Sequence, residues 1–250
     1  GNDGWVLVSE TGVSSHYAGT KLSEGTQDGL YTIAFPEKAE NGGVGDATIA
    51  ASIPSLTSWK TITVGETLKP IVETTSAYDN VRPFYEPTQV YQPGRSTWSW
   101  ILWQDASCNY KDQQTFIDLA AAMGYEYILI DALWDNQIGY ENMPSLIAYA
   151  QSKGVDVLLW YNSNGSCNDA PQGPKHRLDS APARQKEMAW MKALGVKGIK
   201  VDFFGGDKQA TMKLYEDILT DANQYGIAVV FHGCTLPRGW ERMYPNHMSS

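Results

Sequence analysis

The pattern of hydrophobic and polar positions changes near residue 95 of this chain. Before that point, short runs alternate apolar or β-branched residues with polar ones and are separated by Gly, Asn, Asp and Pro: Trp5–Ser9, Leu30–Phe35 and Trp59–Val64. No helical period emerges in this part. The pattern predicts that residues 1–80 are the last strands of an antiparallel β-sandwich whose earlier strands precede Gly1.

Residues 81–95 form the predicted joint between two domains. Three prolines, Pro83, Pro87 and Pro93, stand there close to Gly94. Prolines at this density favour an extended surface linker over a helix or a central strand.

From residue 96 onward, apolar strand-like runs alternate with helical patterns. The predicted strands are 96–103, 125–131, 155–161, a run within 195–206 that ends at Asp202, and 227–232. The predicted helices are 113–123, 143–153, 182–194 and 209–225. A glycine follows each helix, as expected of a helix that ends in a left-handed residue. This alternation predicts a parallel sheet.

The sheet is either a (β/α)8 barrel or a doubly wound sheet. A barrel is favoured because no glycine-rich phosphate loop follows the first strand and polar or aromatic residues end every strand. Residues 96–250 are therefore predicted to be the first part of a (β/α)8 TIM-type barrel, truncated after about strand five.

The residues at these strand ends are the candidate functional residues, because parallel strands bring their carboxyl ends to one rim. They are Trp98, Trp100, Trp103, Asp131, Trp134, Tyr161, Asn162, Asn164, Lys200, Asp202 and His232. Carboxylates and a lysine bind hydroxyl pairs, tryptophan faces cover C–H surfaces, and one carboxylate remains for attack at an anomeric carbon. Taken singly, Asp131 and His232 are equally well explained as structural residues, and Asp202 as a helix cap. Their joint placement favours a site for a neutral polyhydroxylated ligand.

Composition narrows the classes of partner. A net charge of −9 and a pI near 4.9 argue against nucleic acid and anionic membranes. The three cysteines make neither a disulfide framework nor a zinc site. No transmembrane segment or signal peptide is evident. The start at Gly1 suggests a cut inside a longer protein, so a periplasmic or secreted location, with its signal outside this sequence, is compatible with the chain.

Two motifs resemble the α-galactosidase clan of retaining glycoside hydrolases: Leu129-Ile-Asp-Ala-Leu-Trp134 and Ile199-Lys-Val-Asp-Phe203. The whole chain more closely resembles glycoside hydrolase family 97. The segments that carry this resemblance are Leu7-Val-Ser-Glu10, Thr57-Ser-Trp-Lys60, Pro93-Gly-Arg-Ser-Thr-Trp98, Lys197-Gly-Ile-Lys-Val-Asp202, Phe231-His-Gly233 and Arg242-Met-Tyr-Pro-Asn246.

The resemblance implies a role for each candidate residue. Asp202 corresponds to the nucleophile, and Asp131, Trp134, Lys200, His232 and Trp100 are the expected sugar-binding residues. Inverting α-glucosidases of the family are expected to carry glutamates at the ends of strands three and five, where this chain has Tyr161-Asn-Ser-Asn164 and Phe231-His-Gly233. The implied activity is therefore that of a retaining, exo-acting hydrolase of terminal α-galactosides.

The alternatives are a β-L-arabinopyranosidase, an inverting α-glucosidase of the same family, a carbohydrate-binding barrel without activity, and a barrel aldolase using Lys200 as a Schiff base. The aldolase is disfavoured because Asp202, two residues from Lys200 on the same strand face, favours a charged lysine.

The resemblance also implies a calcium ion near the active site, with Glu10 as one ligand. One glutamate is not a Ca²⁺ site, because this cation takes six to eight oxygen ligands. The remaining ligands and the acid/base glutamate are expected to follow the Tyr-Pro-Asn segment, beyond Ser250. Residues 1–250 alone are accordingly expected to be inactive.

Overall fold

The structure is a computed structural model that describes residues 4–250, so the start of the chain at Gly1, where a cut is expected, lies outside the described residues. The chain divides into two compact units. The first contains the residues up to Glu86 with Gly205–Glu216 and Thr235–Pro245; the second contains Pro87–Phe204, Asp217–Cys234 and Asn246–Ser250. The chain first leaves the first unit between Glu86 and Pro87, within residues 81–95. It later re-enters that unit over Gly205–Glu216 and Thr235–Pro245, which a division into two consecutive segments does not include.

The second unit is built on a six-stranded parallel sheet in the order β10-β9-β8-β7-β6-β5. Its strands are β5 (Ser96–Trp98), β6 (Tyr127–Ile130), β7 (Asp156–Asn162), β8 (Gly198–Asp202), β9 (Ala228–Phe231) and β10 (His247–Ser249). The long helices that connect them are α4 (Tyr110–Met123), α6 (Met143–Ser152), α7 (Ala181–Leu194) and α8 (Gln209–Tyr225). This is the sheet-and-crossover arrangement that the alternating sequence pattern predicts.

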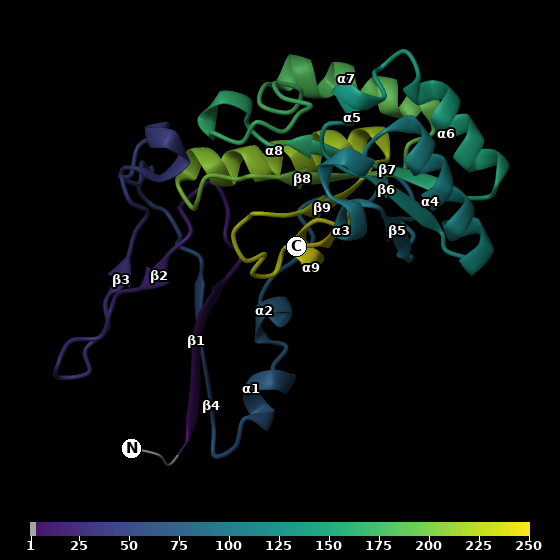
Figure 1. Ribbon diagram of the computed structural model, residues 1–250. Coiled ribbons are helices and arrows are strands. Elements are labelled where there is room, and N and C mark those ends of the chain that lie inside the picture. Colours follow the sequence, from purple (N-terminus) through teal and green to yellow (C-terminus); the bar gives the residue numbers. More distant parts are fainter. Residues whose placement is uncertain (1–3) are drawn as a thin grey trace. The chain divides into compact units, whose positions relative to one another are not determined.

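Helices α4, α6 and α7 lie along one face of this sheet (Figure 1). Helices α4 and α6 turn apolar stripes inward, and in α4 the stripe is Phe116, Ile117 and Ala120. The spacing of three to four residues places these side chains on one helix face, which explains why the helix packs there. Gly124 ends α4 with a φ of 64°, a left-handed conformation that costs glycine little.

Two features of the sheet differ from the prediction. β10 adds a sixth parallel strand beside β9, where five were expected. Its three residues carry too short an apolar run to be recognised by periodicity. The predicted strand 96–103 ends at Trp98, and the chain then forms the short helix α3 (Trp100–Trp103). The tryptophans there favour a strand by propensity, but the N–H groups of Leu102 and Trp103 both donate to the Ser99 carbonyl, which closes a helical turn.

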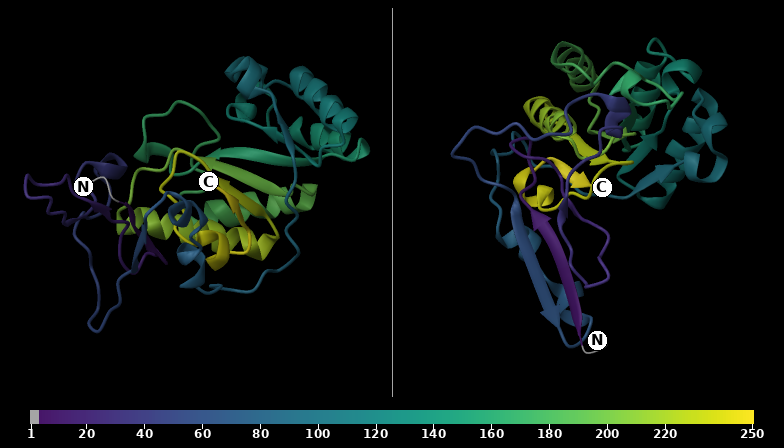
Figure 2. Two further views of the ribbon diagram at one scale, coloured as in Figure 1. Left: turned by 90° about the horizontal axis from the view of Figure 1, so that it is seen from below. Right: turned by 90° about the vertical axis from the view of Figure 1, so that its left-hand side faces the viewer.

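The first unit contains two antiparallel pairs. β1 (Trp5–Thr11) pairs with β4 (Trp59–Gly65) along all seven residues, and the right-hand view of Figure 2 shows this ribbon. β2 (Lys21–Leu22) pairs with β3 (Ile33–Ala34), so the predicted strand 30–35 is only two residues long. The antiparallel strands expected here are thus present, but in the described residues they form only two-stranded sheets.

Short helices complete the two units. They are η1 (Glu40–Gly43), α1 (Lys69–Glu73), α2 (Ser76–Asp79), η2 (Asp105–Ser107), α5 (Trp134–Gln137), η3 (Gly165–Cys167) and α9 (Trp240–Met243).

Candidate active site

Side chains at the carboxyl ends of β5 to β9 line one cavity of about 310 Å³, all within the second unit. The cavity is large enough for a single sugar ring. Its lining residues are Trp98, Trp100, Asp105, Asp131, Ala132, Trp160, Gln172, Lys200, Asp202, Phe203, His232 and Gly233.

Asp202 is the last residue of β8 and is only 5% exposed. Its Oδ1 accepts a hydrogen bond from the backbone N–H of Phe203 at 2.7 Å. Its Oδ2 lies 3.2 Å from Trp160 Nε1, 3.0 Å from His232 Nδ1 and 3.8 Å from Lys200 Nζ. Contacts on several sides therefore hold the carboxylate in one orientation.

Glycine is required beside this carboxylate. Gly233 has a φ of 50°, and a Cβ at that position would stand 2.6 Å from Asp202 Oδ1. Phe203, directly after Asp202, also has a positive φ of 66°. A bulky residue in that conformation is uncommon and is held by its surroundings.

Lys200 and Asp131 form a buried ion pair next to Asp202. Lys200 Nζ lies 2.9 Å from Asp131 Oδ2, and the two side chains are 6% and 4% exposed. Asp131 also accepts hydrogen bonds from Trp98 Nε1 at 2.7 Å and from the Ala132 N–H at 2.8 Å. Lys200 is thus bound to one carboxylate and close to a second, and it does not stand in the apolar pocket that a Schiff-base lysine needs.

Aromatic rings form one wall of the cavity. Trp98 and Trp100 stack with centroids 5.7 Å apart, and Lys200 Nζ lies 4.3 Å from the centroid of Trp98. Trp100 Nε1 donates to Asp105 Oδ1 at 2.6 Å. Stacked indoles beside carboxylates give the combination of apolar face and hydroxyl acceptors that a sugar needs.

The alternation of side chains along a strand explains which predicted residues reach the cavity. Trp160 pairs in register with Lys200 and shares its face, so it lines the cavity. Tyr161, one residue on, faces the helices, where its hydroxyl donates to Glu187 at 2.9 Å.

Four other predicted rim residues are also absent from the cavity wall. Trp134 is fully buried, stacked on Trp190 with centroids 6.1 Å apart, and its Nε1 donates to the Trp160 carbonyl. It therefore presents no surface to a ligand, contrary to the expected sugar contact. The others are Trp103, which is half-exposed and packs edge-on against a helix, Asn162, which ends β7, and Asn164, which follows that strand.

Six residues that line the cavity were not among the candidates from the sequence: Asp105, Ala132, Trp160, Gln172, Phe203 and Gly233. Period-two alternation counted back from Asn162 could have identified Trp160. Asp105 begins the short helix η2 and Gln172 lies in a loop, where strand alternation carries no such signal.

Cys108 is not a candidate nucleophile, although it lies close to the site. Burial, with the charges of Asp131 and Asp105, raises the pKa of its thiol to about 12. The protonated thiol is a weak nucleophile.

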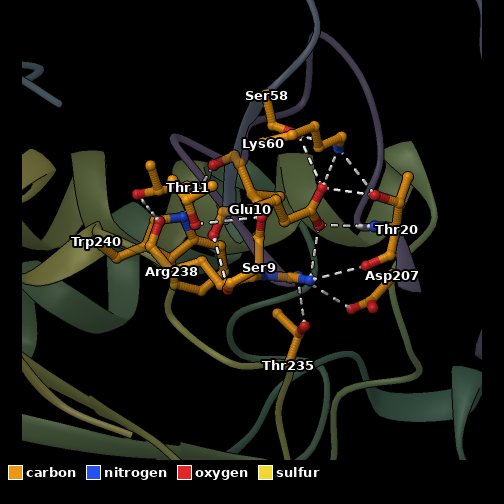
Figure 3. A network of polar contacts seen from close by, with 12 residues as sticks. Ser9, Glu10, Thr11, Thr20, Ser58, Lys60, Asp207, Thr235, Arg238 and Trp240 are labelled. Atoms are coloured by element: carbon orange, nitrogen blue, oxygen red, sulfur yellow. Dashed lines mark hydrogen bonds and ion pairs between the residues drawn. The ribbon is translucent and has the colours of Figure 1, made fainter. Parts of the chain in front are cut away.

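Glu10, the expected calcium ligand, lies in the first unit and is surrounded by hydrogen-bond donors (Figure 3). Lys60 Nζ lies 2.5 Å from Oε2, and Arg238 Nη1 lies 2.8 Å from Oε1. Thr20 donates through its backbone N–H and its hydroxyl, and Ser58 through its hydroxyl. Burial raises the pKa of Glu10, but hydrogen bonds from Lys60 and Thr20 and the charge of Arg238 outweigh it and leave the pKa below the ordinary 4.5.

This arrangement does not fit a calcium site. Ca²⁺ needs several oxygen ligands, whereas two cationic side chains already bind this carboxylate. Among residues 4–250, no group of three or more His, Cys, Asp or Glu side chains is placed to hold a metal. Calcium binding remains a prediction from family resemblance.

We expect Glu10→Gln to lower the free energy of unfolding by roughly 3–5 kcal/mol at pH 7, because Arg238, which is nearly buried, loses the carboxylate at 2.8 Å and keeps the more distant one of Asp207 at 3.8 Å. Since folding lowers the pKa of Glu10, its contribution is present above about pH 4.5 and is lost as the pH falls through the folded value. Urea unfolding of both proteins at pH 7 and at lower pH measures the loss of stability and its pH dependence. The same measurement with Ca²⁺ or with EDTA tests whether calcium is bound. If EDTA destabilises the wild type but not Glu10→Gln, Glu10 is a calcium ligand and our interpretation is wrong.

A parallel sheet with helical crossovers and a pocket of carboxylates, lysine and tryptophans at its carboxyl edge is the architecture of barrel-type glycoside hydrolases. Residues 91–250 match the family model described as Glycoside hydrolase 97, and the chain belongs to this family. No helix within residues 4–250 has the length and apolar character needed to cross a membrane.

Three relatives refine the comparison. The probable retaining alpha-galactosidase of Streptomyces bingchenggensis (strain BCW-1) is 27% identical over 260 residues, which cover 98% of this chain and 37% of the relative. The retaining alpha-galactosidase of Bacteroides thetaiotaomicron is 26% identical over 172 residues, which cover 62% of this chain and 24% of the relative. A crystal structure of a beta-arabinopyranosidase is 62% identical with a TM-score of 0.96, covering 98% of this chain and 39% of that one. The chain thus spans less than two fifths of the length of each.

Proposed function

We propose that the protein carrying this chain is a retaining, exo-acting glycoside hydrolase with Asp202 as its nucleophile. The observation that carries this proposal is the placement of Asp202, a buried carboxylate at the end of β8 that faces a sugar-sized cavity. In the whole protein, the six parallel strands would belong to an eight-stranded barrel and the antiparallel pairs to a sandwich.

The reaction would proceed by double displacement. An oxygen of Asp202 attacks the anomeric carbon while the bond to the leaving group breaks, and a general acid protonates that group. Water then attacks the anomeric carbon of the glycosyl ester, and the residue that acted as general acid now takes a proton from this water. The bond to Asp202 breaks, and Asp202 is released as carboxylate. We expect the acid/base residue to lie outside this sequence, as the family resemblance implies.

The charges in the cavity support this chemistry. The residues that line the cavity include three carboxylates, those of Asp105, Asp131 and Asp202, and one ammonium group, that of Lys200. The excess of negative charge suits the positive charge that develops on the sugar in an oxocarbenium-like transition state. Asp131 and Lys200 would bind ring hydroxyls, and the Trp98 and Trp100 rings would cover the apolar face of the sugar.

Two substrates share the ring stereochemistry that this site would accept: β-L-arabinopyranosides and α-galactosides, which differ by a hydroxymethyl group at C5. The 62% identity to a beta-arabinopyranosidase favours the first, and the more distant retaining alpha-galactosidases support the second.

The test compares the 4-nitrophenyl β-L-arabinopyranoside and α-D-galactopyranoside as substrates of the full-length protein. We expect kcat/KM to be at least about tenfold higher for the arabinopyranoside, since accommodating or excluding one hydroxymethyl group is worth roughly 1–3 kcal/mol. NMR of the first product formed should show the anomeric configuration of the substrate. An inverted product, or no cleavage of either substrate, contradicts the proposal, and the α-D-glucopyranoside serves as the 4-epimeric control.

A further inference from the structure

Asp105 differs from the other two carboxylates of the cavity in its hydrogen bonding. Oxygens of Asp131 and Asp202 accept bonds from lysine, indole and backbone donors. Asp105 Oδ1 accepts one bond, from Trp100 Nε1, and in the described part of the chain no donor is bonded to Oδ2. It also has no cationic partner among these residues, so it has the largest unused acceptor capacity in the cavity.

The backbone that presents Asp105 is held in an unusual conformation. Gln104 has a φ of 57° and a ψ of −161°, a combination nearly confined to glycine. Surrounding hydrogen bonds maintain it: the Gln104 N–H and side chain both donate to the Trp100 carbonyl, and Ser107 donates twice to the Gln104 carbonyl. Gln137 Nε2 donates to the Asp105 carbonyl at 2.8 Å. A strained residue directly before a cavity-lining carboxylate points to a functional requirement for its position.

Several side chains stand between Asp105 and the nucleophile in the network of contacts that lines the cavity. Contacts lead from Asp202 through Lys200 to Asp131, then to Trp98, its stacking partner Trp100, and finally Asp105. A pyranose with C1 at Asp202 extends its C3 and C4 edge away from that residue. The hydroxyl groups on this edge are hydrogen-bond donors in need of an acceptor.

We propose that Asp105 is a specificity-determining residue that accepts a hydrogen bond from the C3 or C4 hydroxyl of the terminal sugar, through the oxygen not bonded to Trp100. This inference rests on the proposed function, since it assumes that the sugar's C1 lies at Asp202. It assigns no chemical step to Asp105. The carboxylate binds and orients the ring and discriminates against sugars that lack the hydroxyl.

Asp105→Asn separates this role from a structural one. An asparagine keeps an oxygen for the Trp100 indole and has the same shape, but replaces the outward oxygen with an NH₂ donor. We expect the unfolding midpoint to stay unchanged and kcat/KM on the best substrate to fall about tenfold or more, as befits loss of a hydrogen bond to a charged group. Asp118→Asn, on the exposed face of α4, is the matched control and should leave kcat/KM unchanged.

The decisive measurement uses 3-deoxy and 4-deoxy versions of that substrate. For the wild type, one deoxygenation should cost about the same factor as the mutation; for Asp105→Asn, the same deoxygenation should cost less than about threefold, because the interaction is already absent. Equal costs of both deoxygenations in the two proteins overturn the inference while leaving the proposed function standing. Failure of the wild type to cleave either parent glycoside would instead overturn the proposed function itself.

Discussion

Asp202→Ala in the full-length protein is expected to lower kcat by roughly a thousandfold or more, because no other carboxylate of the cavity stands at the end of β8 to form the glycosyl ester. Added azide should restore turnover by occupying the space left by the carboxylate, and the glycosyl azide produced should have the inverted configuration. The control is Asp156→Ala, because Asp156 begins β7 and so lies at the amino-terminal end of the strands, whereas the cavity lies at their carboxyl ends.

Mass spectrometry identifies the nucleophile directly. After the wild type is treated with a 2-deoxy-2-fluoro glycosyl fluoride of the preferred sugar, the label should lie on the peptide that contains Asp202. A label on any other peptide contradicts the assignment, as does an Asp202→Ala variant with wild-type activity.

Lys200→Met is expected to have the second largest effect, and to affect stability as well as activity. Lys200 is nearly buried between Asp131 and Asp202, at 2.9 and 3.8 Å, so its removal leaves two buried carboxylates without their shared cation. Breaking a buried ion pair in this way costs roughly 3–5 kcal/mol of unfolding free energy. We also expect kcat/KM to fall at least about tenfold, since a donor to sugar hydroxyls is lost.

The matched control for Lys200→Met is the double variant Asp131→Asn/Lys200→Met. It removes one of the stranded charges and should regain part of the lost stability, which urea unfolding measures. A destabilisation below about 1 kcal/mol in the single variant, or no recovery in the double variant, contradicts the ion-pair interpretation.

Much of the second unit followed from local sequence. A buried strand such as β6 is a continuous hydrophobic run, and a helix such as α4 shows its stripe and its terminal glycine without any knowledge of partners. The spacing of Lys200 and Asp202 was equally informative, because residues two apart on a strand share a face. The sixth strand, β10, was not predicted, because its three residues become a strand only through pairing with β9.

The order of the elements and the end of the strands at which carboxylates gather can be predicted from the chain alone, because hydrophobic periodicity and strand direction are local properties. Which side chains reach the cavity depends on tertiary packing. Trp134 was expected there but is fully buried, while Trp160 faces the cavity and Asp105 enters it from the first residue of η2. Tertiary packing also brings Glu10 its partners: Arg238 lies 228 positions away in the chain, and no sequence pattern relates two residues at such a separation before the chain folds.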